Sequence, residues 1–303
     1  MNGIILVNAY IRSEGAFRQA ERMREELAAL GLAARVEKNG NFLCSVQRGG
    51  ICLSEPIDFC VYLDKDKYLP RMLEKCGVRL FNTAEAVELC DDKMLTYIAL
   101  AGKGVNMPDT LAAPLCYYAD AKLREGYAET IGARLGYPVI VKKSFGSWGM
   151  DIELAENEEQ LKDAAERCRM SPHLYQKYIS AHRGEDYRVI VVGGRTVAVM
   201  KRSNPHDFRS NIECGGKGSP AKVPDSFTEQ AERCAEILGL DYCGVDILDD
   251  NGTPVVCEVN SNAFFNEAER VTGVNIAGAY AQRIAEVLGV RCTNFKACAV
   301  LDR

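Results

Sequence analysis

Three oxygen-bearing side chains near the end of the chain have the spacing of metal ligands. Two apolar runs, GVDIL at 244–248 and VCEVNSN at 256–262, flank a turn, and an acid interrupts each. Because alternate side chains of a strand point to opposite faces, a hairpin whose paired residue numbers have an even sum places Asp246, Glu258 and Asn260 on one face. Such oxygens suit Mg²⁺, which binds carboxylates together with substrate phosphates. The alternative is a sheet with one solvent-exposed face, on which these acids have no function. The other face of the hairpin is expected to carry Val245, Ile247, Cys257 and Val259.

A second segment, PVIVKKSFGSWGMDI at 138–152, has the composition of a phosphate cradle. It places Lys142 and Lys143 at the end of an apolar strand, next to a loop that contains Gly146 and Gly149. Glycines allow backbone N–H groups to approach an anion closely, and a lysine adds a positive charge. No GKS or GKT opens a helix here, so this is not a Walker A loop. An ordinary hairpin with a glycine turn is the alternative.

Two further groups of charged residues could bind anions. Asp92 and Lys93 lie in a helix-like segment, where the alternative is an exposed pair on a solvated face. Cations and amide donors also crowd a glycine-rich stretch at 201–218, which could be a mobile anion clamp or a solvated loop. Its polar members are Lys201, Arg202, Asp207, Arg209, Ser210 and Asn211.

The composition limits where this chemistry takes place. The chain has 303 residues, of which 47% are hydrophobic and 26% are charged, enough for two or three globular domains. A net charge of −5 gives no global attraction to nucleic acid or to anionic lipid. No stretch approaches the roughly 20 apolar residues that span a bilayer, and the chain begins directly with a strand at 4–7. We therefore expect a cytoplasmic protein that binds neither nucleic acid nor membrane.

The thirteen cysteines are expected to be reduced. They are scattered singly, without a CxxC pair, and are predicted to be small buried hydrophobic residues. Cys292 and Cys298 are the one pair close enough in sequence to form a bridge or bind a metal. With three histidines in the chain, zinc chemistry is not expected.

The elements that must position these groups alternate between strand and helix patterns. Residues 4–7, 16–30 and 32–36 have the pattern of a βαβ unit, and strands at 59–63 and 78–81 with a helix at 68–76 repeat it. A linker is predicted at 107–118, followed by a helix within 121–135. Strands follow at 138–143, 152–154, 175–179, 187–192 and 196–202, and helices at 158–168, 228–238 and 275–288.

Seven motifs, taken in order, resemble the ATP-grasp ligases and most closely their RimK-like branch. They are DDK, PVIVKKSFGSWG, YQKYI, GEDYRVIVVGGRTVAVMKR, DFRSN, GVDIL and CEVNSN, and they extend from 92 to 289. The resemblance implies an α/β (α+β) fold: an N-terminal domain with a parallel sheet at 1–91, a central domain at 92–174, a β-rich C-terminal domain with an antiparallel sheet at 175–290 and a tail at 291–303. ATP would be held between the second and third domains.

The resemblance also implies roles for individual residues. Lys93 and Lys142 match the phosphate-binding lysines, and Gly146, Ser147 and Gly149 match the loop that closes over the phosphates. The hinge that meets adenine through its backbone matches Gln176, Lys177, Tyr178 and Ile179, and the acid after it matches Asp186. Positions facing the phosphates and the substrate carboxylate match Arg188, Arg202, Arg209, Ser210 and Asn211, with Arg202 and Lys142 as catalytic cations. The metal ligands match Asp246, Glu258 and Asn260, for two Mg²⁺ ions with Mn²⁺ as an alternative.

The chemistry implied is amide formation through an acyl phosphate, adding an amino acid such as glutamate. The partners would be a small-molecule acid and amine, or a peptide or protein terminus, and a homo-oligomer stays open. An ATP-grasp kinase acting on a hydroxyl and a non-catalytic ATP-binding module are the alternatives. Two departures from the family pattern are Trp148 in the glycine-rich loop and Lys177 in the hinge.

Overall fold

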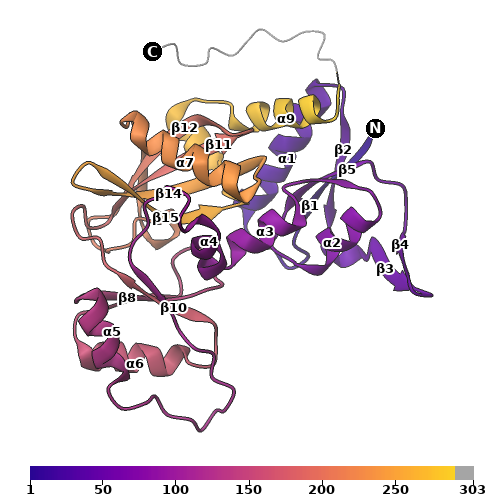
Figure 1. Ribbon diagram of the computed structural model, residues 1–303. Helices are drawn as coiled ribbons and strands as arrows, with labels where there is room; N and C mark the ends of the chain where they lie inside the picture. The colour runs from indigo at the N-terminus through magenta and orange to yellow at the C-terminus, as the bar shows by residue number, and fades with distance from the viewer. Residues whose placement is uncertain (291–303) are drawn as a thin grey trace.

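The computed structural model describes residues 1–290, which form three large sheets with helices packed against them and one two-stranded sheet (Figure 1). The N-terminal sheet is parallel and has the order β2-β1-β5-β6. Its strands are β1 (Asn2–Val7), β2 (Ala33–Lys38), β5 (Phe59–Leu63) and β6 (Arg79–Phe81). Its helices are α1 (Glu14–Ala29), α2 (Tyr68–Lys75) and α3 (Ala84–Asp91). Alternate residues of β1 enter different cores, Ile4 and Leu6 with α2 and Ile5 and Val7 with α1, as a sheet covered on both faces requires.

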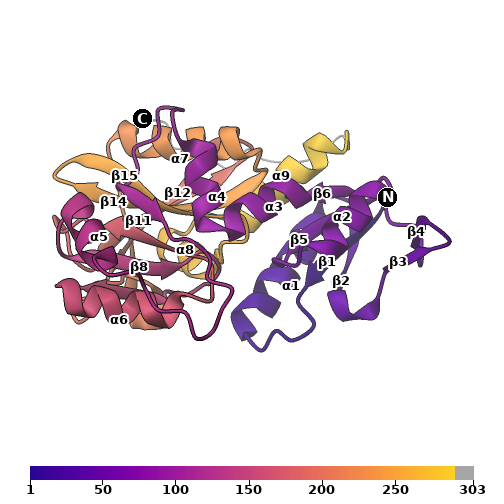
Figure 2. The same cartoon turned by 60° about the horizontal axis from the view of Figure 1, so that its bottom comes forward.

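The central sheet is antiparallel and has the order β7-β10-β8-β9. Its strands are β7 (Thr110–Ala112), β8 (Val139–Lys143), β9 (Ile152–Ala155) and β10 (His173–Lys177). The helices α5 (Tyr127–Leu135) and α6 (Glu158–Cys168) lie together on one side of it (Figures 1 and 2). The segment predicted as a linker contains β7, which pairs with β10. This strand has only three residues and lies between prolines, so its pattern is too short to recognise.

The third sheet is antiparallel and has the order β13-β12-β11-β14-β15. Its strands are β11 (Glu185–Val192), β12 (Arg195–Ser203), β13 (Lys217–Pro220), β14 (Tyr242–Asp250) and β15 (Thr253–Asn260). One face packs against α4 (Lys93–Leu100) and α7 (Asp225–Leu238), and the other against α8 (Asn266–Thr272) and α9 (Ile276–Val287). Shorter elements are the hairpin β3 (Cys44–Gln47) and β4 (Gly50–Leu53), and the 3₁₀ turns η1 (Asn39–Asn41) and η2 (Ile212–Cys214).

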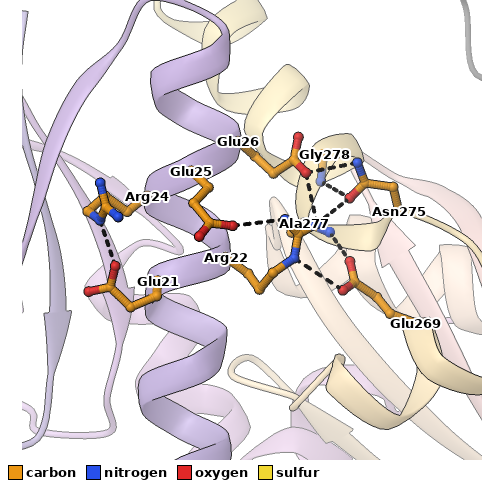
Figure 3. A network of polar contacts seen from close by, with 9 residues as sticks. All are labelled: Glu21, Arg22, Arg24, Glu25, Glu26, Glu269, Asn275, Ala277 and Gly278. Atoms are coloured by element: carbon orange, nitrogen blue, oxygen red, sulfur yellow. Dashed lines mark hydrogen bonds and ion pairs between the residues drawn. The ribbon is translucent and has the colours of Figure 1, made fainter.

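One hydrophobic core joins the N-terminal sheet to the five-stranded sheet. Met23 and Leu27 of α1 pack in the same cluster as Tyr280 and Ile284 of α9. At the edge of this contact the Arg22 guanidinium donates to the side-chain oxygen of Asn275 at 3.1 Å, and the Asn275 amide donates to Glu26 at 2.9 Å (Figure 3). The N-terminal domain is therefore packed as one body with the sheet that carries the predicted metal ligands.

The boundaries predicted at 92 and 175 stay predictions. The strand β10 lies across the second of them, since it begins at His173 and pairs within the central sheet. The helix α4 follows the first boundary, yet it packs against α7 and β15 of the third sheet. Each of the eleven cysteines within 1–290 is a free thiol, and six are buried as predicted: Cys44, Cys60, Cys90, Cys168, Cys234 and Cys243. The prediction of burial is wrong for the other five, since Cys52 is exposed and Cys76, Cys116, Cys214 and Cys257 are half-buried. Cys292 and Cys298 lie outside the described residues. Within 1–290, none of the helices has the length and apolar character needed to cross a membrane.

Candidate active site

The hairpin of β14 and β15 brings the predicted metal ligands to one face. Asp246 pairs with Glu258 and Gly244 pairs with Asn260, the register that the sequence analysis assumed. The register then shifts between Asp246 and Ile247, so that Ile247 pairs with Val256. Directly opposite residues in an antiparallel pair have side chains close enough to interact, and Asn260 follows Glu258 by two positions on the same face.

The same register shift corrects one prediction about this hairpin. Cys257 was expected on the apolar face with Val259, but Val256 occupies the core beside Val259. Cys257 instead lines a cavity together with Lys142. A β-bulge adds one residue to a strand and so reverses the alternation beyond it.

Two arginines neutralise Asp246. Arg188 makes two hydrogen bonds to its carboxylate, both 2.8 Å long, and Nη2 of Arg202 lies 2.9 Å from Oδ2. Burial opposes ionisation, but the two guanidinium groups hold the pKa of Asp246 below its usual value. Arg202 is itself buried and also binds Asp186, with Nε 2.7 Å from Oδ1. Asp186, Arg202, Asp246 and Arg188 thus form one continuous ion-paired row across three strands.

Lys93 connects the glycine-rich loop to Glu258. Asp92 caps α4 by accepting hydrogen bonds from the N–H groups of Met94 and Leu95, at 2.9 and 3.2 Å. The cap fixes the position of Lys93, whose Nζ donates to the carbonyl of Gly146 at 2.9 Å and lies 3.3 Å from Glu258. Lys93 is buried, so the Asp92–Lys93 pair is not the exposed pair of the alternative interpretation.

Lys142 is a buried cation without a carboxylate partner among the described residues. Its side chain is 3% exposed, and Nζ donates to the phenol oxygen of Tyr97 at 3.0 Å. The Tyr97 hydroxyl in turn donates to the carbonyl of Cys257. A buried charge with only neutral partners is costly, so this ammonium is well suited to bind an anion.

The predicted nucleotide residues gather around one cavity between the central and the five-stranded sheets. Its apolar lining comes from both layers, with Ile140 and Ile152 on one side and Leu248 on the other. The predicted residues that line it are Lys142, Gln176, Lys177, Tyr178, Ile179, Asp186, Arg209, Ser210 and Asn211. The buried Tyr178 hydroxyl has no hydrogen-bond partner among the described residues. The sequence analysis missed Phe208, whose ring packs edge-on against Tyr178.

The glycine-rich loop closes over a second, smaller cavity, which Lys93, Gly146, Ser147, Gly149 and Glu258 line. Gly149 has φ +70°, and a Cβ there would lie 2.8 Å from the side-chain oxygen of Asn211, so this position favours glycine. Arg209 donates to the carbonyl of Gly149 at 2.6 Å. The loop that was predicted to be an anion clamp therefore holds the glycine-rich loop from one side.

A third cavity of about 200 Å³ lies on the other side of the predicted metal ligands. Arg188, Glu258 and Asn260 line it together with Asn8, Asp64 and Lys65 of the N-terminal domain. Sequence reasoning missed these three residues because the N-terminal domain carries no matching motif. The available signal was their position, since each follows directly on β1 or β5, and ligands of parallel sheets bind at the carboxyl ends of strands.

Two β-layers enclose the nucleotide cavity, with Lys142 on the central layer and Asp186, Asp246 and Glu258 on the five-stranded layer, an arrangement that matches the ATP-grasp fold. A sequence profile described as the RimK-like ATP-grasp domain matches residues 90–284. The chain therefore belongs to the RimK-like ATP-grasp family, and both the predicted family and the predicted fold class are confirmed.

Curated relatives carry names of glutamate-joining enzymes. The chain is 36% identical over 234 residues to beta-citrylglutamate synthase B of Danio rerio, covering 76% of this chain and 56% of the relative. It is 35% identical over 238 residues to N-acetylaspartylglutamate synthase A of Homo sapiens, covering 77% and 59%. A probable alpha-L-glutamate ligase of Maridesulfovibrio salexigens is 35% identical, covering 69% and 67%. The chain thus spans little more than half the length of the vertebrate relatives.

Solved structures share the fold at low identity. A RimK domain ATP-grasp protein of Sphaerobacter thermophilus superposes with a TM-score of 0.69 at 20% identity, covering 93% of this chain and 99% of that one. D-alanine–D-alanine ligase of Bacillus anthracis superposes with a TM-score of 0.73 at 16% identity, covering 96% and 97%. The ATP-grasp ligase PsnB, solved with Mg and ADP, has a TM-score of 0.67 at 19% identity, covering 94% and 98%.

Proposed function

We propose that this protein is an ATP-dependent carboxylate–amine ligase that adds an amino acid such as glutamate to an acid. The observation that carries the proposal is the pair of cavities on either side of Glu258, one beneath the glycine-rich loop and one against the N-terminal domain. The cavity beneath the glycine-rich loop suits the phosphates of ATP, and the cavity against the N-terminal domain suits the acid and the amine that are joined. The names of the glutamate-joining relatives support this choice of reaction.

ATP would lie with its base in the apolar cavity at the hinge and its phosphates beneath the glycine-rich loop. The backbone of 176–179 would meet adenine, and the unpartnered Tyr178 hydroxyl offers a further polar contact. Lys142 would bind a phosphate because its buried ammonium has no carboxylate partner within residues 1–290. Lys93 would bind a second phosphate when its ammonium group leaves Glu258. Asp186, Arg209, Ser210 and Asn211 complete this lining.

The donor set fits the proposed magnesium site. Asp246 and Glu258 are cross-strand neighbours, and Asn260 lies on the same face with its amide nitrogen buried and unpartnered. The amide can therefore turn its oxygen toward an ion without losing a hydrogen bond made by its nitrogen. Asp246 would have to release part of its contact with Arg188 or Arg202. Mg²⁺ bound here, as two ions or with Mn²⁺ in its place, would neutralise charge on the transferred phosphoryl group.

The reaction would need positioning more than a protein nucleophile. The acid takes the γ-phosphoryl group, and the amine nitrogen then attacks the acyl carbon as the bond to phosphate breaks. Of the two protons that the ammonium loses, one goes to the departing phosphate and one to solvent. The glycine-rich loop would exclude water from the acyl phosphate. Arg202 stays a proposed catalytic cation, although its contacts to Asp186 and Asp246 favour a role in positioning Asp246.

The non-catalytic alternative rested on Trp148 blocking the site. The Trp148 side chain is 48% exposed and does not line the nucleotide cavity. It lines the third cavity, called the chamber below, which lies against the N-terminal domain. It therefore lies where it can affect the choice of substrate. A small-molecule acid and amine, a peptide or protein terminus, a homo-oligomer and a cytoplasmic location all remain part of the proposal.

The test is ADP release by the purified protein over a panel of acids and amino acids, with mass spectrometry of the products. Citrate and N-acetylaspartate are the first acids and glutamate is the first amine, because the relatives' names contain them. A product with the combined mass less one water supports ligation. A phosphorylated product that forms without any amine would instead identify a kinase, and ATP binding without turnover would identify a binding module.

A further inference from the structure

Three polar side chains meet at the carboxyl edge of the N-terminal sheet. Asn8 follows β1, Asn39 follows β2, and Asp64 follows β5. The Asn39 amide donates to Oδ2 of Asp64 at 2.6 Å, and the Asn8 amide lies 3.2 Å from both carboxylate oxygens. The backbone N–H of Lys65 donates to Oδ1 at 2.8 Å. Asp64 is thereby held in one orientation, at the point of a parallel sheet where ligands bind.

No cation neutralises this carboxylate among the described residues. Asp64 is 8% exposed, and all of its donors are neutral amides. The neighbouring Lys65 ammonium turns away to Asp91 at 3.2 Å and to the Ser147 hydroxyl at 3.0 Å. Burial, together with the nearby charges of Asp66 and Asp91, raises the pKa of Asp64. A buried carboxylate of this kind is costly unless a cation joins it.

Asp64 lines the cavity that also contains Glu258 and Asn260. This chamber lies between the glycine-rich loop, which contributes Ser147 and Trp148, and the N-terminal domain. The amide nitrogen of Asn260, which also lines it, is buried and has no partner among the described residues. The distance between Asp64 and Glu258 does not depend on a mobile domain contact, because the core around α1 and α9 and the Arg22–Asn275 contact join the two sheets (Figure 3).

The far side of this chamber carries arginines and also glutamates, Glu267 and Glu269 among them. Arg188, Trp148, Glu213 and Phe264 are shared with an adjoining cavity of about 690 Å³, which Arg18, Arg22 and Arg270 also line. Arg18 has no carboxylate within ion-pair distance among the described residues, whereas Arg22 and Arg270 do. On this arginine side Arg18 is therefore the cation that can attract a substrate carboxylate, which Asp64 repels.

We propose that Asp64 binds the ammonium group of the amine substrate and orients its nitrogen toward the acyl group held at Glu258 and Asn260. The inference rests on the proposed ligase function and assigns the amine to the N-terminal domain and the acid to the arginine side. It gives this domain, which carries none of the family motifs, a residue that distinguishes amines from acids. The charge of Asp64 then serves substrate binding at the expense of the unliganded fold.

The experiment compares Asp64→Asn with the wild-type protein in two assays. The first measures the KM for glutamate in amide formation. The second replaces the amine with hydroxylamine, which is largely uncharged at pH 7.5 and traps the acyl phosphate as a hydroxamate. The variant is expected to raise the KM for glutamate at least 10-fold while hydroxamate formation stays within about twofold, because one charge-assisted contact is typically worth about a factor of ten.

The matched control is Asp58→Asn, at the opposite edge of the same sheet, where the carboxylate accepts a hydrogen bond from the backbone of Asn2. It should change neither assay. Asp64→Glu, which keeps the charge, should recover part of the affinity, and thermal melts of all three variants establish folding.

An unchanged KM for glutamate in a folded Asp64→Asn protein overturns the inference, as does equal loss of amide and hydroxamate. A wild-type protein that forms neither product with any acid removes the ligase function and the inference with it. If Asp64→Asn loses affinity for glutamate but still forms hydroxamate, the result supports both the ligase function and the proposed role of Asp64.

Discussion

The ammonium of Lys142 in β8 lies 3.0 Å from the phenol oxygen of Tyr97 in α4, and this contact joins the two layers that enclose the nucleotide cavity. The Tyr97 hydroxyl in turn donates a hydrogen bond to the carbonyl of Cys257 in β15. The cation is thus oriented by a neutral group and keeps its charge for a phosphate.

Replacing Lys142 with Met should lower the rate of ADP release by about 10² to 10³, the usual cost of losing one preorganised donor to a developing charge. The aliphatic chain keeps the packing, so the melting temperature without nucleotide should change little. Lys162→Met, on the exposed face of α6, is the matched control and should leave the rate unchanged. A Lys142→Met protein with normal turnover would remove this lysine from the phosphate site.

Glu258 should be required for metal-dependent turnover. Glu258→Gln keeps the shape but loses the negative charge that faces Lys93 at 3.3 Å. We expect turnover to fall by at least about 10², as for other lost electrostatic contacts in a site, and the Mg²⁺ concentration at half-maximal rate to rise. Glu159→Gln on α6 serves as the control, and chelation of divalent ions should stop the wild-type enzyme. Full activity of Glu258→Gln at low Mg²⁺ would contradict the metal assignment.

Arg202 should matter for stability as well as for activity. Its removal in Arg202→Met leaves Asp186 buried without its bidentate partner and Asp246 with Arg188 alone. Breaking a buried ion pair on one side typically costs about 3 to 5 kcal/mol, which urea unfolding would measure. Arg167→Met breaks an exposed pair with Glu153 and should cost less than about 1 kcal/mol. Similar losses for both variants would show that burial does not determine the effect.

Lys65 should control how tightly the glycine-rich loop closes. It reaches from the N-terminal domain to the Ser147 hydroxyl at 3.0 Å, and Lys67 lies over the Phe145 ring at 4.2 Å. Without the first contact the loop should admit water, which would hydrolyse the acyl phosphate. Lys65→Ala is therefore expected to release more ADP per amide formed, whereas the exposed Lys75→Ala should not. An unchanged ratio of ADP to amide would exclude this role.

Local pattern predicted the parts of the site that are made by neighbouring residues in sequence. The parity of the 244–260 hairpin placed Asp246, Glu258 and Asn260 on one face, which is the observed pairing. The bulge that turned Cys257 toward the cavity has no sequence signature, because it depends on how the strand fits its neighbours.

Contacts between distant segments could not be predicted in this way. The pairing of Arg202 with Asp186 depends on the register of β11 against β12. The approach of Asp64 and Lys65 to the site depends on how the N-terminal sheet packs through α1 and α9. The family resemblance supplied the proposed roles of Lys93 and Lys142, but it covered none of the N-terminal domain.

His173 in β10 should make stability depend on pH. Its Nδ1–H donates to the Ser171 carbonyl at 2.8 Å, and its Nε2 lies 2.8 Å from the Tyr175 hydroxyl, from which a neutral imidazole accepts. Burial lowers the pKa of His173. Below its unfolded pKa, near about 6.5, the unfolded chain binds a proton that the folded chain does not. Stability should therefore be complete above that pH and fall as the pH drops toward the folded pKa, by at most about 1.4 kcal/mol per pH unit. In His173→Gln this part of the slope between pH 7 and 5.5 should disappear, even if the variant is less stable throughout. Parallel urea-unfolding curves for both proteins across that range would show that another group titrates.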